Sequence, residues 1–350
     1  MDIRKSLIKD PGKILIIKPS SLGDVVHGLP FLNAVRTCFS KAEIHWVIAK
    51  GLEGLLEGHP MIHKLWIINK DAWKNIKNVG STVKELKVLF RELKKEHFDL
   101  VVDLQGLLRS GVITAATGSP VRVGFTEARE GSRVFYTHKV EGGKNIHAVD
   151  RYLKIAELLG CDTSDICFPF PLNKQSSSPI FHLSSSVPHP SEGYAVLVPG
   201  ARWKTKIWPP EKFGELSSKL SLSSIIVGGK RDINTANKIV GLSRGKALSL
   251  AGKTNLKELI EVVRHAQFLV SNDSGPMHIA AALGIPVFAI FGPTDPLRTG
   301  PYGKGHAVIK EKISCSPCLK RTCNDTKCMK NLSVGKVYEV IKEKISNNII

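Results

Sequence analysis

Short apolar runs alternate along the chain with segments in which apolar residues recur every three or four positions. In the first half, the runs KILIIK, AEIHWVIA, KLWIIN and FDLVVDLQG predict buried strands, and helices are predicted at 25–39 and 83–96. In the second half, strands are predicted in YAVLVPGA, SSIIVGG, ALSLAG and FLVSND, and helices at 213–220, 233–242 and 256–265. Strands and helices that alternate in this way form parallel βαβ units, so the sequence predicts an α/β fold with doubly wound sheets.

One segment interrupts the alternation. Residues 173–193, NKQSSSPIFHLSSSVPHPSEG, are rich in serine and proline and carry almost no charge, which is typical of a linker. The 350 residues also exceed the roughly 250 to 300 at which single cores stop growing. We therefore expect one Rossmann-like domain at 1–172, a second at 194–331, and a cleft between them. The amphipathic segment at 332–350 is expected to pack back toward the N-terminal domain.

The turn after the first predicted strand, KPSSLGDVVHGLP, carries a carboxylate at the start of a helix. Gly23 permits a tight turn, and Asp24 follows where the helix begins. A carboxylate at this position can cap the helix, which contributes roughly 1 kcal/mol to stability. It can also act as a general base, and the local pattern leaves both interpretations open. The turn lacks the glycine spacing and the final Gly-Lys-Ser/Thr of a P-loop.

Two turns of the second half carry groups that suit a nucleotide diphosphate. The segment VPGARWKTKIWPPEKF places Arg202, Lys204 and Lys206 between a strand and a helix, where cations can bind phosphate. A solvated basic loop is the alternative interpretation of this segment. In VGGKRDINTAN, a glycine pair permits close approach of a ligand, and Asp232 can accept hydrogen bonds from ribose hydroxyls.

The stretch VSNDSGPMHIAAALGIPVFAIFGPTDP has the pattern of a strand, a polar turn, a short helix and a second strand. Pro276 suits the first turn of that helix because no needed N–H is lost there. The N–H groups of residues 274–277 are expected to point at an anion, with the helix dipole behind them. The three turns of the second domain together predict a nucleotide diphosphate site. With Asp24 contributed by the first domain, this is the arrangement that a transferase needs.

Charge favours anionic partners. Fifty Lys and Arg residues against 31 Asp and Glu give a formal charge of +19, which suits nucleic acid, lipid head groups or phosphorylated substrates. The basic residues are not interleaved with stacking aromatic groups, so no specific nucleic-acid partner is expected. A nucleotide-dependent oxidoreductase is disfavoured because no Gly-x-Gly-x-x-Gly turn follows the first strand. No apolar run approaches the ~20 residues of a spanning helix, and we expect a soluble cytoplasmic protein.

Two further features leave alternatives open. The predicted helix at 83–96 carries cations around an apolar stripe, which indicates either a solvated face or docking on an anionic membrane surface. The segment CSPCLKRTCNDTKC has the ligand number of a structural zinc site, although only its first pair has the tight spacing of such sites. Reduced or oxidisable thiols on a loop are the alternative. The four cysteines are Cys315, Cys318, Cys323 and Cys328.

The motifs KPSSLGDVVHGLP, VPGARWKTKIWP, GKTNLKEL and SNDSGPMHIAAALGIPVFAIFGPTDP occur in an order that strongly resembles the ADP-heptose:lipopolysaccharide heptosyltransferases, glycosyltransferase family 9. The resemblance covers nearly the whole chain. The stretches GFTEAREGSRVFYTHKV and NIHAVDRYL are most similar to the heptosyltransferase I branch. The resemblance implies a GT-B fold and an inverting mechanism, with ADP-heptose as the donor and with no cofactor or catalytic metal required.

The resemblance also implies roles for individual residues. Asp24 matches the family's general base, and Arg129 lies in the segment expected to meet the anionic groups of the acceptor. The remaining matches concern the donor: Lys206 at the diphosphate, with Arg202 in place of hydroxyl residues; Asp273 near heptose hydroxyls; Ser274, Gly275 and His278 in the donor turn, His278 near the phosphates; Thr254 on the adenine side; and Asp232 at the ribose.

The implied acceptor is Kdo of a lipid A type glycolipid. Such an acceptor lies in the cytoplasmic leaflet, so the resemblance implies a peripheral enzyme on the anionic inner-membrane surface, where its positive charge would contribute to binding. The alternative within the family is heptosyltransferase II or a core-extending enzyme, which uses an acceptor that already carries heptose.

Overall fold

The computed structural model describes residues 8–74, 79–143, 145–171 and 193–347. The chain divides into two compact units, Met1–Asn173 and Lys174–Ile350. Residues 172–192, which contain nearly all of the predicted linker, lie outside the described residues. No helix in the part of the chain that the structure describes is long and apolar enough to cross a membrane.

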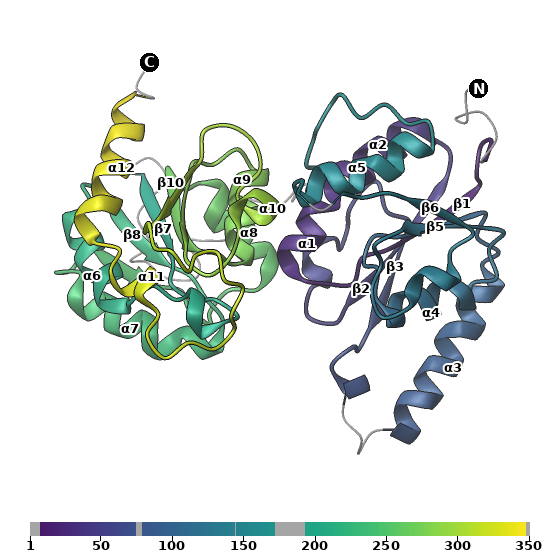
Figure 1. Ribbon diagram of the computed structural model, residues 1–350, viewed down its shortest axis with the longest axis horizontal. Helices are drawn as coiled ribbons and strands as arrows, with labels where there is room; N and C mark the ends of the chain where they lie inside the picture. The colour runs from purple at the N-terminus through teal and green to yellow at the C-terminus, as the bar shows by residue number, and fades with distance from the viewer. Residues whose placement is uncertain (1–7, 75–78, 144, 172–192, 348–350) are drawn as a thin grey trace. The chain divides into compact units, whose positions relative to one another are not determined.

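Six parallel strands form the sheet of the first unit, in the order β3-β2-β1-β4-β5-β6 (Figure 1). Their bounds are β1 Lys13–Ile17, β2 Glu43–Ala49, β3 Lys64–Ile68, β4 Leu100–Asp103, β5 Val121–Phe125 and β6 His138–Val140. Ile14, Leu15, Ile16 and Ile17 of the central strand β1 are fully buried, because helices cover both faces of the sheet.

Within the described part of the first unit, five α-helices cover this sheet. Helices α1, α2 and α5 contact one another on one face, and α3 and α4 lie on the other face (Figure 1). Their bounds are α1 Leu22–His27, α2 Leu29–Cys38, α3 Val79–Lys95, α4 Leu108–Ala116 and α5 Ala148–Leu158. Short 3-10 helices are η2 Glu53–Leu55, η3 Ala72–Lys74 and η5 Ser132–Phe135.

The second unit repeats this plan. Its six parallel strands have the order β12-β11-β10-β7-β8-β9. The strands are β7 Tyr194–Val198, β8 Ser223–Ile226, β9 Ala247–Ser249, β10 Phe268–Asn272, β11 Val287–Phe291 and β12 Ala307–Lys310. The helices are α6 Pro210–Lys219, α7 Ile233–Leu242, α8 Leu256–Arg264, α9 Gly275–Ala282, α10 Pro296–Thr299, α11 Lys327–Lys330 and α12 Val334–Asn347, with η8 Lys204–Lys206 and η9 Lys230–Asp232.

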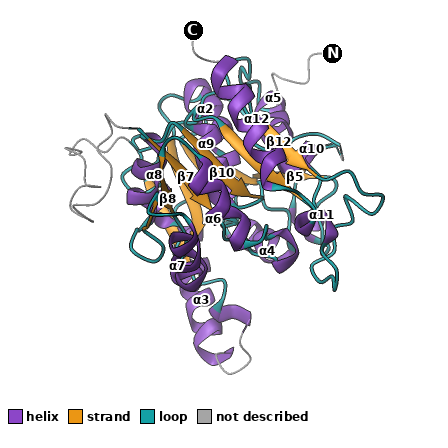
Figure 2. Cartoon of the chain, turned by 90° about the vertical axis from the view of Figure 1, so that its left-hand side faces the viewer, coloured by secondary structure: helices purple, strands orange, loops and turns teal. Residues whose placement is uncertain are grey.

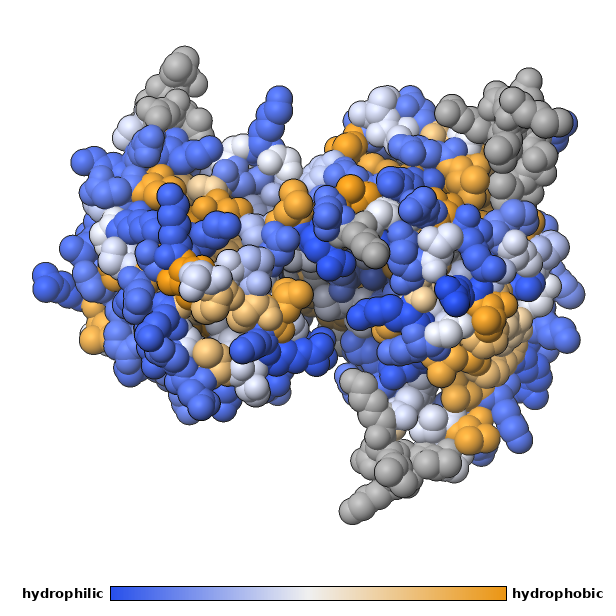
Figure 3. Space-filling model, in the orientation of Figure 1, coloured by the Kyte–Doolittle hydropathy of each residue, from blue (hydrophilic) through white to orange (hydrophobic). Residues whose placement is uncertain are grey.

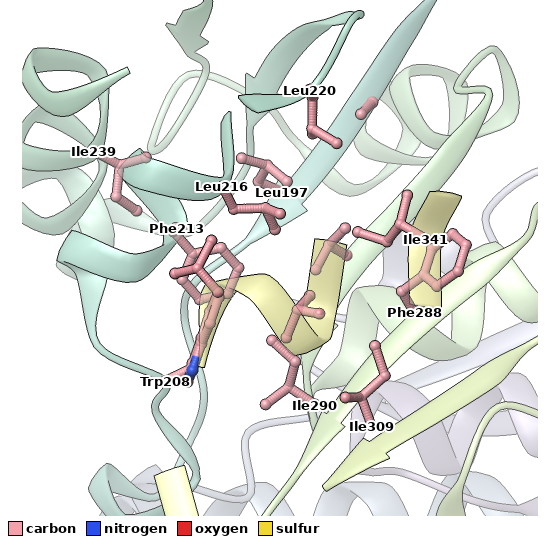
Figure 4. Close-up of a cluster of buried hydrophobic side chains, with 14 of the residues drawn as sticks. Leu197, Trp208, Phe213, Leu216, Leu220, Ile239, Phe288, Ile290, Ile309 and Ile341 are labelled. Carbon is pink, nitrogen blue, oxygen red and sulfur yellow. The ribbon is translucent and has the colours of Figure 1, made fainter. Parts of the chain in front are cut away.

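Helix α12 belongs to the core of the second unit. It contacts α6 and β12, and Figures 1 and 2 show it with α6 over the strands of this unit. Val337 and Ile341 are buried in the cluster that also contains Trp208 and Phe213, whose rings meet edge to face at 5.0 Å (Figure 4). The apolar face of α12 is therefore used within its own unit, and the packing of α12 toward the N-terminal domain stays a prediction.

The structure agrees closely with the predicted elements. The predicted strands and helices named above are present with ends that differ by a few residues, except that the single helix predicted at 25–39 is two helices, α1 and α2, which meet at Gly28. The α/β class is confirmed, and the two sheets are doubly wound as expected.

His45 on β2 lies in the core of the first unit, and its burial decides its protonation state. The residue is 1% exposed, and its Nδ1 accepts a hydrogen bond of 3.2 Å from the Trp66 indole N–H. Its Nε2 has no hydrogen-bond partner. Burial lowers the pKa of His45 to about 4, although the Glu96 carboxylate opposes this shift.

Because the folded pKa of His45 lies below its unfolded value, stability is highest above about pH 6.5 and falls as the pH drops toward 4. We expect this residue to account for a loss on the order of 2 kcal/mol of unfolding free energy across that window. Urea unfolding at pH 7 and pH 5 measures the loss, and His45→Gln should reduce it. His63→Gln, which changes the exposed ring stacked on His45, is the control. An unchanged pH dependence in His45→Gln would contradict the assignment.

Candidate functional site

Asp24 lies in the first turn of α1, directly after the central strand β1. Its Oδ2 accepts hydrogen bonds from the backbone N–H and the Oγ of Ser21, both at 2.7 Å. These contacts confirm that Asp24 caps the helix. The side chain is nevertheless 36% exposed, and its Oδ1 lies 4.0 Å from Lys18 Nζ. Capping therefore uses one carboxylate oxygen, and the carboxylate stays within reach of a substrate.

Lys18 is the buried cation behind this carboxylate. It is 3% exposed, its Nζ donates to the Leu104 carbonyl at 3.4 Å, and it lies 5.1 Å from the centre of the Tyr152 ring. Burial alone would lower the pKa of Lys18, but the Asp24 carboxylate and other groups keep that pKa above its usual value. Lys18 is therefore a charged positioning group for Asp24. Sequence reasoning missed it, although a lysine directly after the fully apolar run ILII was an available signal.

The turns after β4 and β5 are ordered by two further carboxylates. Asp103 is fully buried and accepts hydrogen bonds from Tyr136 Oη at 2.6 Å and from two backbone N–H groups of the following turn. Burial raises the pKa of Asp103 despite these bonds. Glu127 accepts from the N–H groups of Gly142 and Gly143. Arg129 is exposed on the turn after β5, and its backbone N–H donates to the Gly106 carbonyl of the turn after β4 at 2.9 Å.

In the second unit, the structure brings two of the predicted turns together. Lys206 Nζ lies 2.6 Å from Asp273 Oδ2, and these side chains are only 16% and 6% exposed. Thr294 Oγ1 donates to the same Asp273 oxygen at 2.6 Å, and Lys206 Nζ lies 4.5 Å from the centre of the Trp203 ring. The turn after β7 therefore supplies the cation, and the turn after β10 supplies the carboxylate that holds it.

Asn272 fixes the spacing of these two turns. Its Oδ1 accepts from the backbone N–H of Trp208 at 3.1 Å, and its Nδ2 donates to the Pro199 carbonyl at 2.7 Å. Asn272 is fully buried, so both bonds are made in a low-dielectric interior where unpaired polar groups are costly. This residue was also missed from the sequence, because its partners lie more than sixty positions away.

The predicted donor turn begins helix α9. Ser274 is the N-cap residue, its Oγ is 3.0 Å from Ser271 Oγ, and Gly275 and Pro276 open the helix. His278, one turn further along, is 7% exposed. The N-terminal N–H groups of such a helix favour an anion, and Lys206 is held close to their turn by Asp273.

The other predicted donor residues lie on neighbouring turns of the same unit. Asp232 accepts from the Gly229 N–H at 2.8 Å, and a Cβ at Gly200 or Gly228 would lie 2.8 Å from Asp232 atoms. The two glycines therefore make room for this carboxylate between the turns after β7 and β8. Thr254 is half-buried just before α8. Arg202 is exposed, and its place at the diphosphate stays a prediction.

The cysteine cluster does not have the geometry of a preformed metal site. Ligands of one ion must lie close together, and among the described residues no three of the four cysteines place their sulfur atoms within 4.8 Å of one another. The zinc interpretation of Cys315, Cys318, Cys323 and Cys328 therefore stays a prediction, because ligand number and partial spacing do not fix the sulfur positions. All four are free thiols.

Among the residues that the structure describes, one set of possible ligands does meet that distance, namely Glu43, His45 and His63. It lies at the amino ends of β2 and β3, the edge of the sheet opposite to Asp24. His45 Nδ1 accepts the Trp66 proton, so the neutral ring carries its own proton on Nε2 and has no second lone pair for a metal. The set therefore does not fit a metal either.

Comparison with known proteins gives consistent matches. A model of glycosyltransferase family 9 (heptosyltransferase) matches residues 86–329, well over half of the chain. Lipopolysaccharide heptosyltransferase 1 of Pseudomonas aeruginosa is 29% identical over 323 residues, which cover 89% of this chain and 87% of that protein.

Solved structures show the same architecture. A family 9 glycosyl transferase from Veillonella parvula superposes with a TM-score of 0.80 at 22% identity, covering 99% of this chain and 100% of that one. E. coli heptosyltransferase WaaC with ADP-2-deoxy-2-fluoro heptose gives a TM-score of 0.76 at 25% identity, with coverage of 95% and 99%. The predicted GT-B fold is thereby confirmed.

Proposed function

The chain belongs to glycosyltransferase family 9, and we propose that it transfers L-glycero-D-manno-heptose from ADP-heptose to Kdo of the lipid A inner core. Transfer of heptose from ADP-heptose in lipopolysaccharide synthesis is supported by the family match, the Pseudomonas relative and the ADP-heptose analogue in the E. coli structure. The Kdo acceptor is supported by the similarity to a heptosyltransferase 1.

The observation that carries the proposal is the buried contact between Lys206 and Asp273 at the amino end of α9. An ammonium group held at a helix N-terminus is well placed for a diphosphate. When the diphosphate binds, Lys206 neutralises it and Asp273 becomes available to accept hydrogen bonds from sugar hydroxyls. Asp232 and Thr254, on adjacent turns, are proposed to bind the ribose and the adenine.

Asp24 is proposed as the general base. Its carboxylate takes the proton of the attacking Kdo hydroxyl as that oxygen bonds to the anomeric carbon of heptose. The bond from that carbon to the diphosphate breaks on the opposite face, which inverts the configuration, and ADP leaves with the electron pair. Lys206 and the N–H groups of α9 stabilise the charge that develops on ADP. Arg129 is proposed to bind anionic groups of the acceptor.

ADP release tests the proposal. The purified protein is supplied with ADP-heptose and either a Kdo-terminated lipid A or an acceptor that already carries the first heptose, with a chelator present. We expect turnover on the Kdo-terminated acceptor alone. Turnover only on the heptose-bearing acceptor would reassign the chain to heptosyltransferase II or to a core-extending enzyme. ADP-heptose consumption that requires added metal would contradict the metal-independent mechanism.

A further inference from the structure

We propose that the surface formed by α3, α4 and η5 of the first unit docks on an anionic phospholipid bilayer. This inference rests on the proposed function in one respect: an acceptor anchored in a membrane requires an enzyme that works at the membrane surface. The surface itself is defined by two independent observations, its exposed apolar side chains and the charges that surround them.

Exposed apolar side chains gather on this surface. Large hydrophobic residues that are between 36% and 73% exposed occur on each of its three elements. Helix α4 contacts both α3 and η5, so these residues lie on adjoining elements, and Figure 3 shows apolar side chains collected on that face of the unit. The residues are Val83, Val88, Leu108, Val112 and Val134. An apolar patch rimmed by polar residues marks an interaction surface.

A groove lies between the edge strand β3 and helix α3. It has a volume of about 680 Å³, and Trp66, Ile67, Trp73 and Val88 are among the residues that line it. Strand β3 is the outermost strand of the sheet. Indole rings and aliphatic side chains at an open groove suit the boundary between lipid head groups and acyl chains.

The charges of α3 indicate which partner is favoured. The helix carries five cations and two carboxylates, and Glu92 is paired with Arg91 and Lys95. Its inner face packs Leu89, Phe90 and Leu93 on the core. The cations are exposed beside Val83 and Val88, and they are Lys84, Lys87, Arg91, Lys94 and Lys95. Cations that flank shallow apolar side chains are typical of binding to anionic lipids rather than to a protein.

The position of the surface also fits its proposed partner. Helix α4 begins just after β4, the strand beside β1, and Asp24 follows β1 at the same edge of the sheet. Arg129 is bonded through its N–H to Gly106, in the turn that leads into α4. A bilayer bound at α3 and α4 therefore lies next to the turns that are proposed to receive the acceptor.

Vesicle cosedimentation without donor or acceptor tests docking. The wild type is compared on phosphatidylcholine vesicles with and without phosphatidylglycerol. A Lys84→Glu/Lys87→Glu/Arg91→Glu variant should bind the anionic vesicles at least about tenfold more weakly. Val83→Asp and Val88→Asp, which change exposed residues of α3, should weaken binding in both low and high salt. The matched control, Lys304→Glu/Lys312→Glu/Lys342→Glu, makes the same charge change on exposed residues of the second unit.

Docking through this surface would be supported if the α3 charge variant and the apolar variants lose binding to anionic vesicles while the control variant keeps it. No binding of the wild type to anionic vesicles, equal loss in the control, or wild-type binding by the apolar variants would overturn it. ADP release on a deacylated, water-soluble acceptor separates this proposal from the enzymatic one. The α3 charge variant should release ADP on this soluble acceptor as fast as the wild type. If the wild type itself released no ADP, the proposed function would be refuted, and the vesicle result would still stand.

Discussion

Replacement of Asp24 by asparagine is expected to lower kcat about 10²- to 10⁴-fold while ADP-heptose binding is retained. The asparagine amide oxygen can still accept the two hydrogen bonds from Ser21, so the start of α1 should fold as in the wild type. The amide cannot take a proton from the acceptor hydroxyl, so only the chemical step loses its base. ADP release at saturating substrates and calorimetric titration with ADP-heptose measure the two quantities.

Two other variants act as references for Asp24→Asn. Ser21→Ala removes one of the two capping hydrogen bonds and should change kcat much less than Asp24→Asn does. Lys18→Met removes the cation that lies 4.0 Å from the carboxylate. The acid limb of the kcat/KM profile should then move to higher pH, because the ammonium group that favours the ionised carboxylate has been removed. Wild-type turnover by a folded Asp24→Asn protein would leave Asp24 as a helix cap only.

Replacement of Lys206 by methionine should have the second large effect, and it should act on both stability and activity. Asp273 would be left as a buried carboxylate without its ammonium partner, which should lower the unfolding free energy by about 3 kcal/mol. The diphosphate would also lose its cation, so kcat/KM for ADP-heptose should fall about 10²- to 10³-fold. Denaturant unfolding and initial rates measure the two losses separately.

A double variant separates these two losses. In Lys206→Met/Asp273→Asn the unpaired charge is gone, so most of the stability should return while the activity stays low. Lys204→Met, which removes an exposed cation from the same short helix, should be close to the wild type in both measurements. If the double variant recovered activity as well, Lys206 would have no direct part in donor binding.

The sequence predicted the elements of this fold well because burial on both faces of a parallel sheet produces long apolar runs, as in β1 and β11. It also predicted that the turns containing Lys206 and Asp273 act on one ligand. This prediction was possible because strands β7 and β10 are neighbours with their carboxyl ends at one edge.

The local sequence pattern did not predict contacts between residues that lie far apart in the sequence. The Lys18 position is set by β4 and α5 as much as by β1, and Asn272 is held by groups on the β7 turn. The zinc site at the cysteine cluster stays a prediction for a related reason. Spacing along a loop limits which thiols can meet, but the backbone between Cys318 and Cys328 decides whether they do.

The two sheets have the same strand order, with the first strand of each unit beside its fourth. In evolutionary terms, the molecule uses one plan twice, and each copy presents its own set of loops at the carboxyl ends of its strands. On the proposed assignment, the loops of one copy select the acceptor and those of the other select the nucleotide sugar. Substitutions after β4 and β5 can therefore create new acceptor preferences without disturbing the turns that hold the donor, which is how a family with one donor chemistry can diversify along a growing oligosaccharide.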